Sequence, residues 1–177
     1  MLRRKGLAVL AALAGVLLVP TAGSADPRSP LTPASELQAA LLQQVNAVRT
    51  RHGLPRLRLS GALGAAASAH SVQMARLGYF SHSSANGTSC ASRIAHYYPA
   101  RGYRSWAVGE NLLWGSPSIG PSRALALWLA SPPHRAVLLS SRWREIGLVA
   151  VHSTSAPGVY HGAPTTIVTA DFGARSH

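Results

Sequence analysis

Three ionisable side chains stand out because each lies among turn-forming or aromatic residues. They are His82 in Tyr-Phe-Ser-His-Ser, Glu110 in Val-Gly-Glu-Asn and His134 in Ser-Pro-Pro-His-Arg. Residues in such contexts are often placed for binding. Two imidazoles and one carboxylate that converge in a cleft would form a three-ligand metal site with a fourth position open to water. Ligands this far apart in the chain have no spacing signature, so the residues alone do not establish convergence.

Other residues that could carry chemistry favour structural roles. His70 lies on the apolar stripe of a predicted helix, where we expect a hydrogen-bonded core histidine. Ser83 and Ser131 lie near candidate histidines, but neither has the strand–turn–helix context of the nucleophile in a Ser-His-Glu hydrolase. The single cysteine, Cys90, is expected to be an unreactive buried thiol.

Apolar residues at helical spacing predict the elements that position these side chains. The predicted helices cover residues 35–53, 60–78, 122–129 and 134–139. Ser35 and Gln38 form a capping-box pattern at the first, Ser60 is the expected N-cap of the second, and Gly78 its stop. Pro132-Pro133 breaks the third helix, and Ser131 is the expected cap of the fourth.

Two β-type runs, 146–151 and 165–172, follow the helices and predict an antiparallel hairpin with a long loop. The middle of the chain, about 79–118, is rich in Gly, Ser, Tyr and Pro and is expected to be loop-rich with short ordered pieces. Helices precede strands without βαβ alternation. The fold class is therefore predicted to be α+β.

The amino-terminal segment is typical of a secretory signal peptide. Arg3, Arg4 and Lys5 precede an uncharged apolar run over 7–19, which Pro20 ends and the small residues of 22–25 follow. This run is shorter than the roughly 20 residues of a membrane span. We expect a signal peptide over 1–25, a Pro-rich linker over 26–34, one domain over 35–177 and a secreted or extracellular protein with no transmembrane segment after cleavage.

The charge of the chain is strongly positive, with 17 Lys+Arg against 5 Asp+Glu among 177 residues. Three of these bases lie in the leader, so the formal charge falls from +12 to +9 in residues 26–177. Such a charge favours anionic surfaces, which makes lipids or anionic envelope polymers candidate partners. The arginines are scattered without interleaved aromatic residues, so we expect no specific nucleic-acid binding. GxxxxGK[ST], GxGxxG and HExxH motifs are absent from the sequence.

Six motifs occur in order along the chain: Leu63-x-x-Ala-Ala-x-x-His-Ser-x-x-Met-Ala, Tyr79-Phe-Ser-His82, Gly109-Glu-Asn111, Trp128-x-x-Ser-Pro-Pro-His134-Arg135, Glu145-Ile-Gly and Ala170-Asp-Phe-Gly173. Their order and spacing resemble the CAP superfamily, also called SCP-like, and most of all its bacterial secreted branch. The superfamily comprises cysteine-rich secretory, antigen-5 and pathogenesis-related-1 proteins. The resemblance extends over about residues 36–174.

The resemblance implies an α-β-α sandwich, with a central antiparallel sheet flanked by helices. It also implies a cleft in which His82, Glu110 and His134 could hold zinc or another divalent metal. The second glutamate of many eukaryotic relatives, which follows the helical Trp128, is absent here.

Three further residues are expected to support this cleft. Asn111 would fix loop backbone by side-chain hydrogen bonds. Ser131 would cap the helix that carries His134. Arg135 would pair with a carboxylate, for which Glu110, Glu145 and Asp171 are the candidates in nearby motifs. Glu145 and Asp171 themselves are expected to be structural residues at strand ends.

Three functions are open from the sequence, and whether the protein is an enzyme is uncertain. The first is a binding module of the envelope or extracellular space whose cleft holds a divalent metal or small ligand. The second is a lipid or anionic-surface binder. The third is a zinc-assisted hydrolase, such as a peptidase or amidase, because three ligands and a water form the catalytic zinc arrangement.

Overall fold

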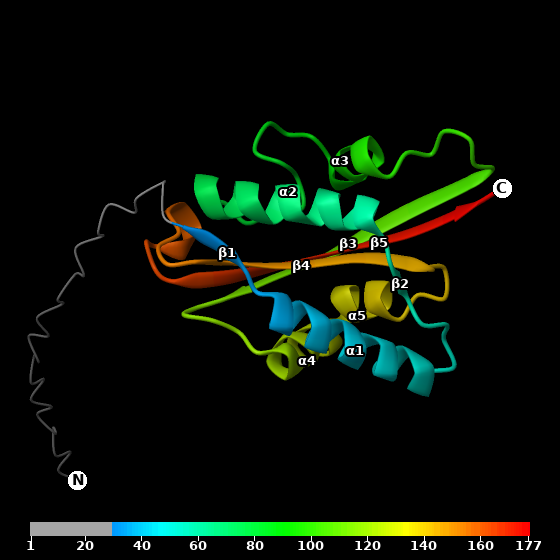
Figure 1. Ribbon diagram of the computed structural model, residues 1–177, viewed down its shortest axis with the longest axis horizontal. Coiled ribbons are helices and arrows are strands. Elements are labelled where there is room, and N and C mark those ends of the chain that lie inside the picture. Colours follow the sequence, from blue (N-terminus) through cyan, green and yellow to red (C-terminus); the bar gives the residue numbers. More distant parts are fainter. Residues whose placement is uncertain (1–29) are drawn as a thin grey trace, which may run out of the picture.

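A computed structural model describes residues 30–177, and Figure 1 shows its layers. The expected signal peptide over 1–25 lies outside the described residues. The elements are β1 (Leu31–Pro33), α1 (Ser35–Arg51), β2 (Arg58–Leu59), α2 (Gly61–Leu77), α3 (Cys90–Tyr97), β3 (Ser105–Gly115), α4 (Pro121–Ala130), α5 (Pro132–Leu138), β4 (Glu145–Ser153), a 3-10 turn (Gly158–Tyr160) and β5 (Thr165–Ser176).

One sheet with strand order β1-β4-β5-β3 forms the middle layer, and the short β2 pairs with β4. The β1–β4, β4–β5 and β5–β3 pairs are antiparallel, whereas β2 runs parallel to β4. Helices α2 and α3 cover one face of the sheet, and α1, α4 and α5 cover the other (Figure 1). The α+β class and the sandwich of a largely antiparallel sheet between helices are therefore confirmed.

The caps predicted from the sequence are confirmed for α2 but not for α1. The capping box predicted at the start of α1 does not form, because the N-cap is Ala34 and no side chain caps the helix. Gln38 instead accepts a hydrogen bond from the backbone N–H of Ala150 at 2.8 Å, so a tertiary contact takes the predicted capping group. Ser60 and Gly78 are confirmed as the N-cap and the left-handed C-cap of α2.

The loop-rich middle predicted over 79–118 contains a longer ordered element than the short pieces expected there. The segment contains the 11-residue strand β3, which pairs along its whole length with β5, from Ser105↔Ser176 to Gly115↔Thr166. Gly109, Glu110 and Asn111 in its centre have low β propensity and conceal the strand. Tertiary pairing and burial override that local preference.

The predicted linker over 26–34 also differs from the structure. Residues Leu31–Pro33 form β1 and pair with Val151–Ser153 at the outer side of β4. The backbone N–H of Ala34 donates to the carbonyl of Ala150 at 2.9 Å. The folded domain thus begins at β1, earlier than the expected residue 35, because proline-containing backbone is tolerated on an edge strand.

Hydrophobic side chains fill both spaces between the sheet and its helices. Trp128 on α4 is 1% exposed in the larger core, and its Nε1–H donates to the carbonyl of Leu112 at 3.2 Å. On the opposite face, Ile94 and Tyr98 of α3 and its C-terminal end pack with Leu63 of α2. Both cores pack against the sheet, so packing on both faces fixes the position of β3.

Helix α2 lies unusually close to β4 at Gly147. A Cβ added there would lie 2.1 Å from the backbone carbon of Leu63 and 2.2 Å from the nitrogen of Gly64. Only glycine permits this approach, since backbone atoms of the helix have no room to move aside. The contact sets the height of α2 over the sheet.

We predict that Gly147→Ala lowers the free energy of unfolding by at least about 2 kcal/mol, because α2 must shift to admit the methyl group. Gly64→Ala is the matched control, since a Cβ there meets no atom within 4 Å and alanine favours the helix. Urea unfolding followed by circular dichroism measures both. Equal stability of the two variants would contradict the close approach.

Candidate functional site

Glu110 lies in the middle of β3, on the face of the sheet that α2 and α3 cover. Side chains alternate along a strand, so Val108, Glu110 and Leu112 share this face, and Val108 and Leu112 pack in its hydrophobic clusters. The Glu110 side chain is 1% exposed. A carboxylate this deeply buried requires charged partners.

His82 and Arg93 supply those partners. His82, in the connection between α2 and α3, places Nδ1 2.7 Å from Oε1 of Glu110. Arg93 of α3 forms a buried ion pair through Nη2 with Oε2, while its Nη1 donates to the carbonyl of His82 at 2.8 Å. Arg93 therefore holds both the carboxylate and the backbone that carries the histidine.

His70 of α2 lies behind this pair, with Nε2 3.9 Å from Oε2 of Glu110. It is 1% exposed, and the same nitrogen bonds to the carbonyl oxygen of Ser81 at 2.8 Å, as expected of a core histidine. Burial, and then the charge of Arg93, lower the pKa of His70. Burial raises the pKa of Glu110, but the His82 hydrogen bond and the charge of Arg93 outweigh it, so the net shift is downward.

A second carboxyl group lies beside that of Glu110, on the neighbouring strand β5. Asp171 of β5 is the antiparallel partner of Glu110, and it is fully buried. Within residues 30–177 neither of its oxygens has a hydrogen-bond donor. Burial, and then the negative charge of Glu110, raise the pKa of Asp171 well above its usual value. The neutral acid resolves this conflict, because its O–H can donate to Glu110.

His134 approaches from the opposite face of the sheet. It lies in the first turn of α5, and Asn111, the next residue along β3 after Glu110, donates through Nδ2 to the His134 carbonyl at 2.9 Å. Ser131 occupies the N-cap position of α5, but its side chain makes no hydrogen bond to the helix backbone. Its Oγ lies instead 2.8 Å from Nδ1 of His134. Burial, and then the charge of His82, lower the pKa of His134.

The three predicted ligands, His82, Glu110 and His134, thus all lie at or beside the edge strand β3, but they do not make equivalent contacts. His82 and Glu110 are in direct contact, and His134 is within electrostatic range of His82. In the part of the chain that the structure describes, no three His, Cys, Asp or Glu side chains are grouped to hold a metal ion. Both oxygens of Glu110 already contact partners, so this arrangement favours Glu110 as a support for His82 over a direct ligand.

Sequence reasoning missed the role of two residues in this cluster and misassigned one. Arg135 is exposed, and the carboxylate partner role expected of it belongs to Arg93. Asp171, expected at a strand end, lies inside β5 opposite Glu110. Glu145, the first residue of β4, contacts the Tyr98 hydroxyl at 2.5 Å. The signal for Asp171 is the β3–β5 register, which only the folded sheet fixes.

The nucleophile candidates are not linked into a relay. Ser131 contacts His134, whereas Glu110 contacts His82, so serine, histidine and acid do not form one chain of hydrogen bonds. Burial raises the pKa of the Cys90 thiol strongly, and Glu110 and Asp171 raise it further. A neutral thiol is a poor nucleophile.

We predict that Asp171→Asn steadily gains stability relative to the natural chain as pH rises from about 4 towards 7. A raised folded-state pKa means that the native state binds more protons, so the natural chain loses up to about 1.4 kcal/mol per pH unit in this window until Asp171 ionises. Asparagine does not titrate and removes this loss. Urea unfolding at four pH values measures it.

Glu36→Gln, on the exposed first turn of α1, is the control and should leave the pH slope unchanged. Parallel pH profiles for Asp171→Asn and the natural chain would show that the buried carboxyl is not held neutral.

Comparison with known proteins agrees with this architecture. The protein is 31% identical over 135 residues to an uncharacterized membrane protein, YlbC, of Bacillus subtilis, in a match that covers 76% of this chain and 36% of the relative. The chain thus spans about a third of the length of that curated relative.

Among solved structures, an outer surface protein of Borrelia burgdorferi superposes with a TM-score of 0.68 at 21% identity, over 84% of this chain and 99% of that one. An extracellular SCP-domain protein of Bacillus anthracis gives a TM-score of 0.60 at 26% identity, over 78% of this chain and 40% of that one.

A family-level match covers most of the described domain. Residues 42–172, which include β3, His82, His134 and Asp171, match the sequence profile of the cysteine-rich secretory protein (CAP) family. The expected resemblance is therefore confirmed, and the chain belongs to the CAP family.

Proposed function

We propose that this chain is a binding module of the cell envelope or extracellular space that holds a divalent metal through His82 and His134. The observation that carries the proposal is the 2.7 Å contact between Nδ1 of His82 and the buried carboxylate of Glu110. An anionic oxygen at that distance accepts the Nδ1 proton. Nε2 of His82 then carries the lone pair that a metal requires.

This is the carboxylate–histidine arrangement that orients metal-binding imidazoles. The His82 side chain is 56% exposed while Glu110 is 1% exposed, so the imidazole is accessible and its support is dry. Arg93 fixes the carboxylate from the other side. The ring therefore has a defined tautomer and direction at little cost in side-chain freedom.

His134 has a comparable support. Its Nδ1 lies 2.8 Å from Oγ of Ser131, and Nδ1–H donating to that oxygen leaves Nε2 with a lone pair. The lowered pKa favours the neutral ring that can bind a cation. Two neutral imidazole nitrogens suit zinc better than magnesium or calcium, which prefer oxygen. A zinc ion bound there would act as a Lewis acid towards a ligand oxygen.

Binding is better supported than hydrolysis. A hydrolytic zinc site needs a free base for the attacking water, whereas both Glu110 oxygens contact His82 and Arg93. The other carboxyl in the cluster, Asp171, is fully buried, and its raised pKa favours the neutral form. Metal-assisted hydrolysis is therefore the weaker alternative.

The envelope or extracellular location is proposed from the leader pattern together with the descriptions of relatives. Two structural neighbours are described as outer surface and extracellular proteins, while the curated relative is described as a membrane protein. Between residues 30 and 177 the chain has no helix that is long and apolar enough to cross a membrane.

Isothermal titration of zinc into the purified protein tests the metal site. We predict saturable binding at one equivalent, reduced at least about tenfold by His82→Ala or His134→Ala, because each substitution removes a ligand. His96→Ala, at an exposed position of α3, is the matched control and should bind as the natural chain does.

Glu110→Gln should weaken binding about 10–100-fold without abolishing it, as expected for a group that orients a ligand. Circular dichroism verifies that this variant is folded, since Arg93 loses its charged partner. Binding unchanged in both histidine variants would reject the site. Complete loss in a folded Glu110→Gln protein would make Glu110 a direct ligand.

A further inference from the structure

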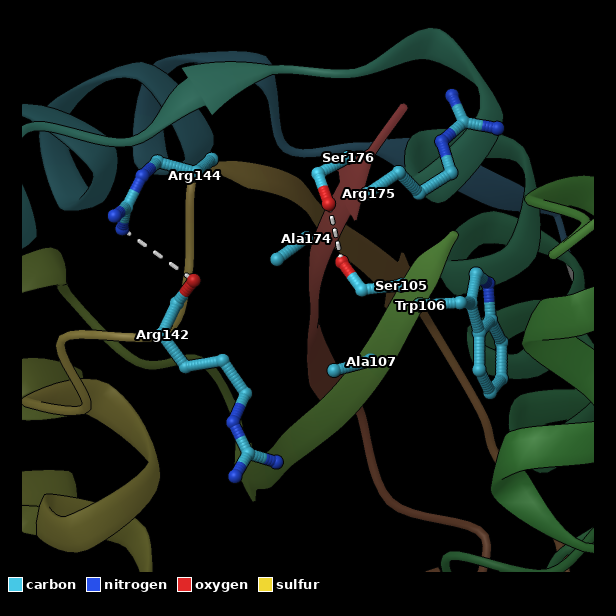
Figure 2. Close-up of a pocket in the computed structure, with 8 residues that line it drawn as sticks. All are labelled: Ser105, Trp106, Ala107, Arg142, Arg144, Ala174, Arg175 and Ser176. Atoms are coloured by element: carbon cyan, nitrogen blue, oxygen red, sulfur yellow. Dashed lines mark hydrogen bonds between the residues drawn. The ribbon is translucent and has the colours of Figure 1, made fainter. Parts of the chain in front are cut away.

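A pocket of about 450 Å³, lined by none of the residues of the histidine cluster, lies where β3 begins, β5 ends and the connection between α5 and β4 passes. Ala107 of β3 and Ala174 of β5 are register partners and line this pocket (Figure 2). Ser105 and Ser176 lie beside them, with their hydroxyl oxygens 2.6 Å apart. Small residues leave the pocket open, and the hydroxyls supply hydrogen-bonding groups.

Arginine dominates the charged lining of this pocket. Arg142, Arg144 and Arg175 contribute to it, and the described residues place no acidic side chain in the lining. Glu145 follows Arg144 directly in the chain, but its carboxylate is engaged by the Tyr98 hydroxyl. The positive charge is therefore not neutralised by a carboxylate within the pocket.

The loop that carries Arg142 and Arg144 is held from beneath by another arginine. Arg49 of α1 is fully buried and donates through Nη1 to the carbonyls of Leu138 and Ser140, at 2.8 and 3.0 Å. Its Nη2 has no hydrogen-bond partner within residues 30–177. Burial, and then the charge of Arg144, lower the pKa of Arg49. Like charges are thus crowded here at a cost that a bound anion would offset.

The lining arginines differ in freedom. Nη1 of Arg144 donates to the carbonyl of Ser141 at 2.7 Å and fixes the loop, and the guanidinium of Arg175 stacks on Tyr98, 3.6 Å from the ring centroid. Arg142 reaches from the loop towards β3 (Figure 2), and its guanidinium has no ion pair or hydrogen bond to any described residue. One free guanidinium beside a fixed positive framework suits an incoming oxyanion.

We propose that this pocket binds a phosphate group carried by an extended anionic polymer of the envelope. A phosphodiester offers the oxygen acceptors that guanidinium and serine hydroxyl donors require. A membrane is disfavoured because none of the large exposed hydrophobic side chains of the described chain, such as Leu59 and Trp114, lines the pocket, so it lacks an anchor for insertion. The site lies apart from the histidines and does not depend on a metal.

Titration of the purified protein with synthetic poly(glycerol phosphate), in the presence of EDTA, tests the proposal. We expect Arg142→Gln to weaken binding at least about tenfold, since it removes the one free charged donor of the lining as the structure describes it. Arg123→Gln on α4 makes the same change in net charge at an exposed position outside the pocket. It should change affinity less than about twofold, because distant surface charges are screened.

The location is tested by amide chemical shifts, which should change most at Ala107, Ala174 and the 140–144 loop when the polymer is added. Equal weakening by Arg142→Gln and Arg123→Gln would overturn the proposal and attribute binding to overall charge. Tighter binding to phosphatidylglycerol vesicles than to the polymer would also overturn it, in favour of a membrane. Folding of each variant is verified by its unfolding midpoint.

Discussion

The buried carboxylate of Glu110 is the interaction around which this part of the molecule is arranged. A charge placed between a sheet and two helices is tolerated only when neighbouring elements neutralise it. Arg93 lies on α3 and His82 in the connection before it. Both contact the carboxylate of Glu110, which thereby links α3 and this connection to β3. Removing Arg93 would leave an uncompensated charge in the core. Helix α3 is thereby held by electrostatics as well as by its apolar face.

The location on an edge strand explains how two faces of the sheet contribute to one site. Glu110 faces α2 and α3, while Asn111 faces α5 and holds the backbone of His134. Only at the edge can side chains from opposite faces approach one another without a strand between them. Strand β3 is the last in the sheet order, so the two histidines can approach each other beyond it.

Features with a local cause were predictable, and those with a tertiary cause were not. Ser60 caps the start of α2 and Gly78 ends it, and both effects depend only on residues at the helix ends. Strand β3 was hidden because a glycine, a buried acid and an asparagine interrupt its pattern, each needed by a neighbour elsewhere in the fold. Arg93 and Asp171 could not be matched to Glu110, because the α3 packing and the β3–β5 register decide those contacts.

The distribution of the few acids connects the two proposed sites. Of the acids in the described range, Glu110 and Asp171 are buried and Glu145 contacts Tyr98, which leaves Glu36 as the one exposed acid without such a contact. The recorded ion pairs of the same range all involve Glu110. The surface arginines consequently have almost no carboxylates to pair with inside the domain. Because Glu110 supports an imidazole, Asp171 is buried and Glu145 contacts Tyr98, none of these three acids neutralises the arginine-lined pocket, and a bound anion would have to come from outside the domain.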